Sequence, residues 1–195
     1  MTALFVAPVA SPGDLAPPGA DAARSPTRLL HPARRRGSTT LGPPELVAVA
    51  EGLARSAGSW PGVRRPVRRT WDLMVAGDAF EAWVIAWPPG GAIELHDHGD
   101  SAGAVVVARG KLLETTVVPG ADGTLETKAT LIRAGTSLSF EGAHVHDIVN
   151  AGRGCAISVH VYSPRLTAMT FYEVTDDRLV PGRTDRYHLG GRAVS

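Results

Sequence analysis

Five of the seven histidines of this chain fall between residues 96 and 160, and their spacing suits metal binding. Two form the sequence HDH at 96–98, and two more form HVH at 144–146. Residues i and i+2 of a β-strand point to the same face, so each pair can present two imidazoles to one ion. One such pair alone could be a surface coincidence, whereas two pairs favour a metal site. Imidazole-rich sites suit iron, zinc, copper or nickel, and the residues do not choose among them.

A third segment repeats the same alternation. Ser158, His160 and Tyr162 share one parity, so a strand would place all three on one face. In a β-barrel the inward faces of the strands converge on the interior, which makes a single site from three segments possible. Taken alone, Tyr162 could equally be a core aromatic whose hydroxyl finds a partner.

The elements that must position these side chains are short strands. From Thr70 to about Val174 the hydrophobic pattern has a period of two and is interrupted by glycine-containing turns. Many short strands at this spacing, with 22 glycines and 15 prolines, predict an all-β sandwich or barrel. The expected strands are Phe80–Trp87, Ala102–Ala108, Lys111–Val118, Leu125–Ile132, Ser137–Phe140, His146–Asn150, Ala156–Tyr162 and Ala168–Val174.

The chain divides into three zones by composition. Residues 1–42 are rich in proline and arginine and poor in acids, so we expect a disordered tail. Residues 43–57 read as a helix, with proline in its first turn and apolar residues at helical spacing. We expect one domain over residues 43–180, followed by a polar C-terminal tail at residues 181–195.

The composition of the chain limits its possible binding partners and its cellular compartment. The 195 residues carry 20 basic and 19 acidic side chains, a net charge of +1 that gives no support to nucleic-acid binding. The apolar stretch Ala3–Ala10 is far shorter than the roughly 20 residues that cross a membrane. Cys155 is the single cysteine, which excludes an intrachain disulfide and a cysteine-based zinc site. We expect a cytoplasmic protein that is a monomer or a weak homo-oligomer.

Three motifs carry a resemblance to a known family. The stretch LHDHGDSAGAVVVARGKLLE at 95–114 resembles the first motif of cupins, and HVHDIVN at 144–150 resembles the second. Cupins usually have a glutamate ligand where this chain has Gly103. That departure, together with SVHVYSP at 158–164, is similar to the cysteine dioxygenase group of thiol dioxygenases. The resemblance covers about residues 69–175 and implies a cupin, a double-stranded β-helix or jelly-roll barrel, with a short N-terminal helical region.

The resemblance also implies a set of iron(II) ligands. His96, His98 and His146 match the three ligands of the family. His146 is preferred to His144 because the last ligand of the family is followed four residues later by asparagine, and Asn150 fits only His146. His144 is then a neighbour of the centre.

Beside the iron, the family has a hydrogen-bonded triad, which Ser158, His160 and Tyr162 match. Gly103 matches the position where animal members carry a cysteine that is cross-linked to that tyrosine. The resemblance therefore implies a bacterial-type member with a free phenol.

The family also binds the substrate carboxylate with an arginine near the start of the barrel. The matching position, counted back from Leu73, falls on Trp71, so Arg69 and Arg68 are the candidates. The planar fork of arginine matches a carboxylate with two hydrogen bonds. The alternative for the sequence RRPVRR at 64–69 is a solvated basic edge.

These residues favour an iron(II)-dependent thiol dioxygenase. Three neutral histidines leave the charge of the ion uncompensated and three coordination positions open, which suits a thiolate and O₂. The expected partners are O₂ and a small thiol, cysteine or 3-mercaptopropionate, which is oxidised to its sulfinate. Two alternatives remain open: a three-histidine cupin with another metal that acts on a diketone, phenolic or sugar substrate, and a non-catalytic binding cupin.

Overall fold

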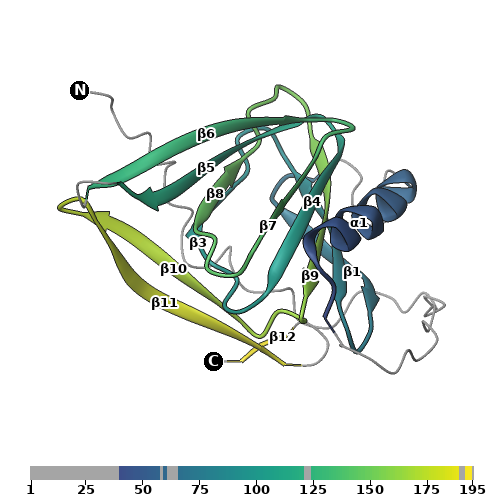
Figure 1. Ribbon diagram of the computed structural model, residues 1–195. Coiled ribbons are helices and arrows are strands. Elements are labelled where there is room, and N and C mark those ends of the chain that lie inside the picture. Colours follow the sequence, from purple (N-terminus) through teal and green to yellow (C-terminus); the bar gives the residue numbers. More distant parts are fainter. Residues whose placement is uncertain (1–39, 58, 61–65, 121–123, 189–191, 195) are drawn as a thin grey trace.

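The computed structural model describes residues 40–57, 59–60, 66–120, 124–188 and 192–194. Within these residues one α-helix precedes twelve β-strands, which form two antiparallel sheets around a common interior (Figure 1). This is the all-β cupin barrel with a short N-terminal helix that the sequence predicted. The tail predicted for residues 1–42 lies outside the described residues except for its last three. No helix in the described part of the chain is long and apolar enough to cross a membrane.

The five-stranded sheet has the order β1-β2-β9-β4-β7. Its strands are β1 (Thr70–Ala76), β2 (Glu81–Trp87), β9 (Ala156–Ser163), β4 (Ala102–Arg109) and β7 (Ser137–Phe140). The central strand β9 is buried along its whole length because it has neighbours on both edges and packing on both faces.

The seven-stranded sheet has the order β12-β11-β10-β3-β8-β5-β6. Its strands are β12 (Arg192–Val194), β11 (Arg178–His188), β10 (Ala168–Thr175), β3 (Ala92–His96), β8 (His146–Val149), β5 (Lys111–Pro119) and β6 (Leu125–Arg133). Three of these elements, β3, β8 and β10, meet where the histidines lie.

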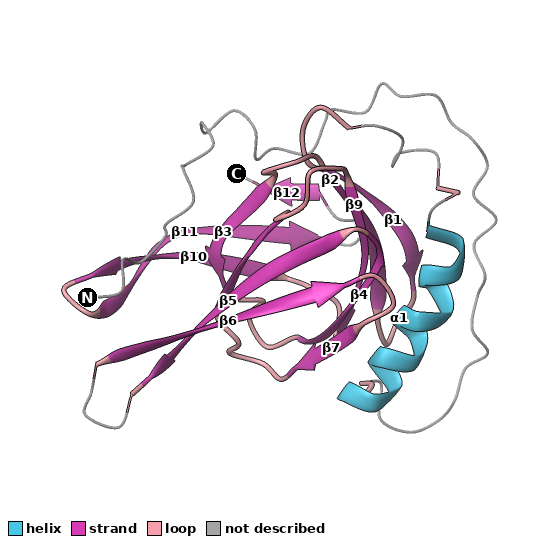
Figure 2. Ribbon diagram, turned by 90° about the horizontal axis from the view of Figure 1, so that it is seen from above, coloured by secondary structure: helices cyan, strands magenta, loops and turns pink. Residues whose placement is uncertain are grey.

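Alternate residues of β9 face opposite sides of the sheet, so one set packs against the helix and the other faces the interior of the barrel. Ile157, Val159 and Val161 belong to an apolar cluster with α1 (Pro43–Ala57), which covers the outer face of the five-stranded sheet (Figure 2). The intervening residues, His160 among them, therefore point to the interior of the barrel. The same alternation in β2 and β4 places alanine and valine under the helix. Small side chains there let the helix lie close to the sheet.

The helix begins and packs as its sequence indicates. The carboxylate of Glu45 accepts a hydrogen bond from the backbone N–H of Gly42 at 2.8 Å, which satisfies a donor at the N-terminus. Leu46 and Ala50 are fully buried against the sheet. The helix therefore seals one face of the barrel and contributes nothing to the interior.

The eight expected strands are present as β2 and β4 to β10, and the structure adds four more. The largest addition is β11, which pairs with β10 where a polar tail was expected from residue 181. A register shift between Thr170 and Tyr172 of β10 accommodates Pro181 and Gly182 within the hairpin.

Candidate metal centre and active-site cavity

Three histidines converge inside the barrel. His96 is the last residue of β3, His98 follows it in the loop, and His146 is the first residue of β8. His96 and His146 are directly paired in the antiparallel register, and one nitrogen of each histidine lies within 4.8 Å of the others. All three side chains are at most 3% exposed. The two HxH segments thus meet, as the sequence predicted.

The hydrogen bonds of these histidines leave nitrogen lone pairs available to bind a metal. Nδ1 of His96 donates to the backbone carbonyl of Glu94 at 2.7 Å, and Nδ1 of His146 donates to Glu114 at 2.7 Å. Each ring therefore keeps Nε2 as an acceptor. Burial lowers the pKa of all three histidines, so the imidazoles are neutral. Nδ1 of buried His98 has no hydrogen-bond partner among the described residues. Neutral, clustered imidazoles fit a transition metal.

Asp97, between two of these histidines, holds the loop in place. One carboxylate oxygen accepts from the backbone N–H groups of Gly99 and Thr170, each at 3.0 Å. The other accepts from the hydroxyl of Tyr172 at 2.7 Å. The loop after β3 is thereby fastened to β10, and Asp97 is excluded from the metal cluster by these contacts.

Glu114 is a buried acid beside the centre that the sequence analysis did not single out. Its Oε1 accepts from Nδ1 of His146 and from Nε2 of His144, the latter at 3.0 Å. Burial alone would raise the pKa of Glu114, but the hydrogen bonds from both histidines outweigh burial and lower the pKa to about 2. His144 therefore bonds to this ionised carboxylate, and its ring also contacts that of His146 edge-on, with centroids 4.6 Å apart.

The predicted triad is assembled and is longer than expected. Nε1 of Trp87 donates to the hydroxyl of Ser158 at 2.8 Å, and that hydroxyl lies 2.8 Å from Nε2 of His160. Nδ1 of His160 lies 3.3 Å from the hydroxyl of Tyr162. An indole N–H can only donate, and Nε2 of His160 is the acceptor that the described contacts offer to the Ser158 hydroxyl, so we assign the Ser158 proton to Nε2 and the ring proton to Nδ1 of His160. Tyr162 then accepts from His160, and its own proton points elsewhere.

Protonation does not disturb this chain near neutral pH. Burial lowers the pKa of His160 to about 3, with smaller contributions from His146 and Arg69. Burial also raises the pKa of Tyr162 above its ordinary range. The imidazole is thus neutral and the phenol keeps its proton.

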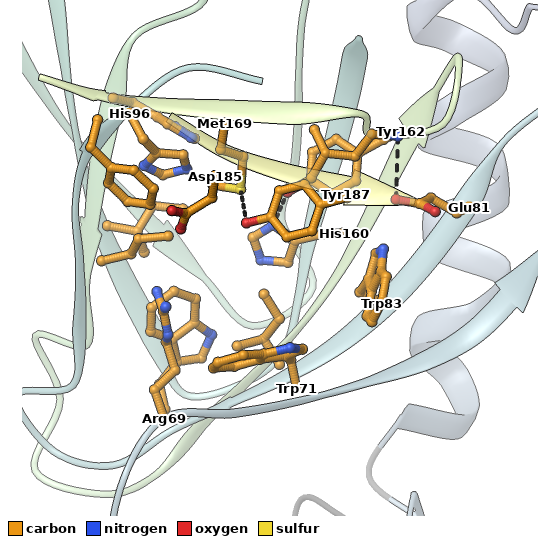
Figure 3. Close-up of a pocket in the computed structure, with 17 residues that line it drawn as sticks. Arg69, Trp71, Glu81, Trp83, His96, His160, Tyr162, Met169, Asp185 and Tyr187 are labelled. Carbon is orange, nitrogen blue, oxygen red and sulfur yellow. Dashed lines mark hydrogen bonds between the residues drawn. The ribbon is translucent and has the colours of Figure 1, made fainter. Parts of the chain in front are cut away.

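Two of the three clustered histidines, His96 and His146, line one cavity of about 110 Å³ together with His160 and Tyr162 of the triad (Figure 3). Its walls are mainly aromatic and aliphatic, and a few polar groups stand among them. The lining residues that carry polar or aromatic groups include Arg69, Trp71, Trp83, Trp87, Asp185 and Tyr187. Such a composition is typical of a small-molecule site.

Arg69 is the candidate arginine that faces this cavity. Its guanidinium lies over the rings of Trp71 and Trp87, at 5.3 and 5.5 Å from their centroids. One guanidinium nitrogen, Nη1, is buried without a hydrogen-bond partner in the part of the chain that the structure describes. Burial lowers the pKa of Arg69 to about 10, which still leaves it charged. Arg68 is exposed and does not line the cavity, so only Arg69 of the two candidates is at the site.

Strand β11 supplies the wall that the sequence analysis missed. Asp185 and Tyr187 both line the cavity, and the hydroxyl of Tyr187 donates to Sδ of Met169 at 3.4 Å. Burial raises the pKa of Tyr187 to about 12. Asp185 and Tyr187 are two residues apart, a spacing that places both on one face of a strand. That spacing was not interpreted because residues 181–195 were expected to be a tail.

Gly103 is packed against Phe140, which explains the missing side chain at that position. A Cβ atom on Gly103 would overlap the ring of Phe140. The ring also stacks on His98, with centroids 4.8 Å apart, and belongs to one apolar cluster with Tyr162. An aromatic side chain thus fills the space beside Gly103 and Tyr162.

The fold and the three-histidine cluster define a cupin with a candidate metal centre. The model of the family described as cysteine dioxygenase type I matches residues 56–175, more than half of the chain. The protein belongs to the cysteine dioxygenase type I family. The match ends before β11, so Asp185 and Tyr187 lie outside the shared region.

Solved structures of low identity resemble the chain. An oxalate oxidase in complex with the substrate analogue glycolate is 19% identical, with a TM-score of 0.47 over 58% of this chain and 57% of that one. A cupin superfamily protein from Desulfitobacterium hafniense is 10% identical, with a TM-score of 0.44 over 55% and 85%. A protein from Thermus thermophilus is 17% identical, with a TM-score of 0.45 over 53% and 91%.

Proposed function

We propose that the protein is an iron(II)-dependent thiol dioxygenase, which converts a small thiol and O₂ to a sulfinate. The observation that carries the proposal is the composition of one cavity. It is lined by two of the three neutral histidines, by the end of the hydrogen-bonded chain at Tyr162 and by Arg69 with its buried Nη1, and the histidine cluster includes no carboxylate. Membership of the cysteine dioxygenase type I family supports the same chemistry.

His96, His98 and His146 are the residues that would hold the iron. Iron(II) bound there supplies the redox chemistry that joins both atoms of O₂ to sulfur. Because all three ligands are neutral, the charge of the ion favours the anionic form of a thiol. The glutamate ligand of other cupins would offset part of that charge, and Gly103 stands in its place.

Arg69 is suited to bind a carboxylate of the substrate. Its unpartnered Nη1 and its planar fork can donate two parallel hydrogen bonds, and the rings of Trp71 and Trp87 hold the guanidinium in place. A mercaptocarboxylate such as cysteine or 3-mercaptopropionate fits a site with one cation and one metal. The apolar walls exclude water from the sulfur during the reaction.

Tyr162 is suited to donate a hydrogen bond inside the cavity. Since its oxygen accepts from His160, its own O–H is free for the substrate carboxylate or for an oxygen atom at the reacting sulfur. His160, held by Ser158 and Trp87, keeps the phenol in that orientation. Catalysis of this type rests on a fixed donor, because no reorganisation is then needed during the reaction.

Anaerobic loading with iron(II), followed by oxygen consumption with a panel of thiols, tests the proposal. We expect uptake of one O₂ per thiol, with the sulfinate identified by mass spectrometry, and none with the matching alcohols. Iron retention without oxygen uptake for any thiol contradicts the proposal. A reducing compartment such as the cytoplasm suits a free thiol substrate, and we expect neither nucleic acid nor membrane as a partner.

A further inference from the structure

Glu114 is a buried charge that lies outside the three-histidine cluster and yet touches it. Its side chain projects from β5 into the barrel and is 4% exposed. The same oxygen, Oε1, lies 2.7 Å from Nδ1 of His146 and 3.0 Å from Nε2 of His144. Burying a carboxylate costs free energy unless hydrogen bonds such as these compensate for the lost water. Packing alone therefore does not explain why a glutamate occupies this position.

The bond to His146 determines which of its nitrogens can serve a metal. An ionised carboxylate only accepts, so Nδ1 of His146 must carry the proton and Nε2 must carry the lone pair. The charge of Glu114 also makes that lone pair more basic. Glu114 thus acts on His146 through a hydrogen bond, and it does not occupy a coordination position of the metal as the glutamate ligand of other cupins does.

A second path leads from Glu114 to another histidine of the cluster. The ring of His144 stacks on Phe140, with centroids 4.7 Å apart and an angle of 11° between the planes. Phe140 in turn stacks on His98, at 4.8 Å and 25°. His144 thus contacts His146 directly, with ring centroids 4.6 Å apart, as well as through Glu114, and it reaches His98 through Phe140.

We propose that Glu114 is a positioning residue, which together with His144 and Phe140 orients His146 and His98 for the metal. The inference rests on the proposed function only in that a metal binds at the three histidines. Glu114 is the principal member because it makes a direct hydrogen bond to an expected ligand, whereas His144 and Phe140 act through packing.

Titration of the metal-free full chain with Co²⁺ under anaerobic conditions tests the role of Glu114. Co²⁺ is the probe because its absorption bands report ligand geometry without redox chemistry. Glu114→Gln keeps the shape and an accepting oxygen but removes the charge, and we expect about tenfold weaker binding. Glu114→Ala removes the bond as well, and we expect roughly a hundredfold loss with shifted bands. Phe140→Leu should shift the bands and change the affinity less.

The control is Glu126→Gln, an exposed acid on β6 of the same hairpin, which should bind Co²⁺ like the wild type. Wild-type affinity and bands in Glu114→Gln overturn the role of its charge. Wild-type values in Glu114→Ala overturn the proposal entirely. If the alanine variant does not fold, shown by its thermal melt without metal, the glutamine variant decides. Because the titration involves neither thiol nor O₂, its outcome is independent of the dioxygenase activity.

Discussion

Nε1 of Trp87 lies 2.8 Å from the hydroxyl oxygen of Ser158, and this contact starts a chain of hydrogen bonds that runs from β2 to Tyr162. The indole donates to Ser158, and the described contacts offer the Ser158 hydroxyl Nε2 of His160 as its acceptor, so we assign the following protons in the same direction. The contact joins residues that are 71 positions apart in the sequence. A three-residue triad becomes a chain of four residues whose last member is free to donate.

Trp87→Phe should remove the preference for one direction of the hydrogen bonds from Ser158 to His160. The ring remains aromatic, but Ser158 no longer receives a proton and can turn its own away from His160. Nitrogen NMR of the imidazole should show His160 protonated at Nδ1 in the wild type and a mixture of tautomers in the variant. Losing one buried hydrogen bond of about 1 kcal/mol should slow turnover roughly fivefold.

Trp71→Phe is the matched control, because Trp71 lines the same cavity and has no bond to Ser158 in the described structure. It should leave the tautomer of His160 unchanged. An unchanged tautomer in Trp87→Phe would show that the direction is set elsewhere.

The arginine at the cavity gives a second prediction. Arg69→Lys keeps the charge but loses the planar fork, so a mercaptocarboxylate should bind more weakly. Hydrogen bonds to charged groups contribute about 1.5–3 kcal/mol, which corresponds to a roughly ten- to hundredfold rise in KM. Steady-state oxygen uptake with 3-mercaptopropionate measures the change.

Two controls accompany the lysine variant. Arg68→Lys changes an exposed neighbour and should have wild-type KM. A thiol without a carboxylate should lose nothing in Arg69→Lys. Equal losses for thiols with and without a carboxylate would show that Arg69 only packs against the tryptophans.

The metal cluster gives a third prediction. Alanine at His96, His98 or His146 should abolish iron retention, because two imidazoles hold an ion far less tightly than three. His144→Ala should keep iron nearly as the wild type does, since His144 lies outside the group formed by His96, His98 and His146 and adjoins it as a neighbour. Iron per chain after gel filtration is the measurement. Iron retained by His146→Ala and lost by His144→Ala would reverse the assignment.

The fold could be predicted from the sequence where the strand pattern was clear. β9 alternates apolar and polar residues, β4 is a short apolar run bounded by turns, and both were predicted to within one residue of their bounds. β3 is five residues long and polar at its end, and β11 contains Pro181 and Gly182, so local propensity opposed both. Pairing with β10 overrides that propensity.

The difference between local pattern and strand pairing also explains which parts of the site were predicted. Ser158, His160 and Tyr162 lie two residues apart on one strand, and that spacing alone puts them on one face. Glu114 reaches His146 only because β5 and β8 pair in a register that sets Glu114 opposite Ile148. A register between segments that lie so far apart in the chain is not visible in either segment.

Acid stability gives a fourth prediction. Burial holds the pKa of His160 at about 3, below its ordinary 6.5, so between these values the unfolded chain binds a proton that the folded chain does not. The free energy of unfolding should therefore fall as pH drops from about 6.5 towards 3, by about 1.4 kcal/mol per pH unit for this group. Urea unfolding of the metal-free protein at several pH values gives the slope. His160→Gln should have a slope that is shallower by about that amount, and equal slopes would contradict a neutral buried imidazole.

The last prediction concerns the hydroxyl at the end of the chain. Tyr162→Phe keeps the ring, which packs with Val105 and Phe140, and removes only the hydroxyl, so fold and iron content should survive. Because Gly103 leaves no cysteine to cross-link, the wild-type phenol is free and can donate. Its loss should cost about 1–3 kcal/mol at the step that uses it, or roughly ten- to a hundredfold in turnover.

His160→Ala should do comparable damage, because it removes the group that holds the hydroxyl in place. The double variant should lose less than the product of the two single losses, since the residues act as one unit. Turnover of the four proteins at equal iron loading, with the melting temperature of each, separates this coupling from a loss of stability. Wild-type turnover in both single variants would show that the triad contributes only packing and takes no part in the reaction.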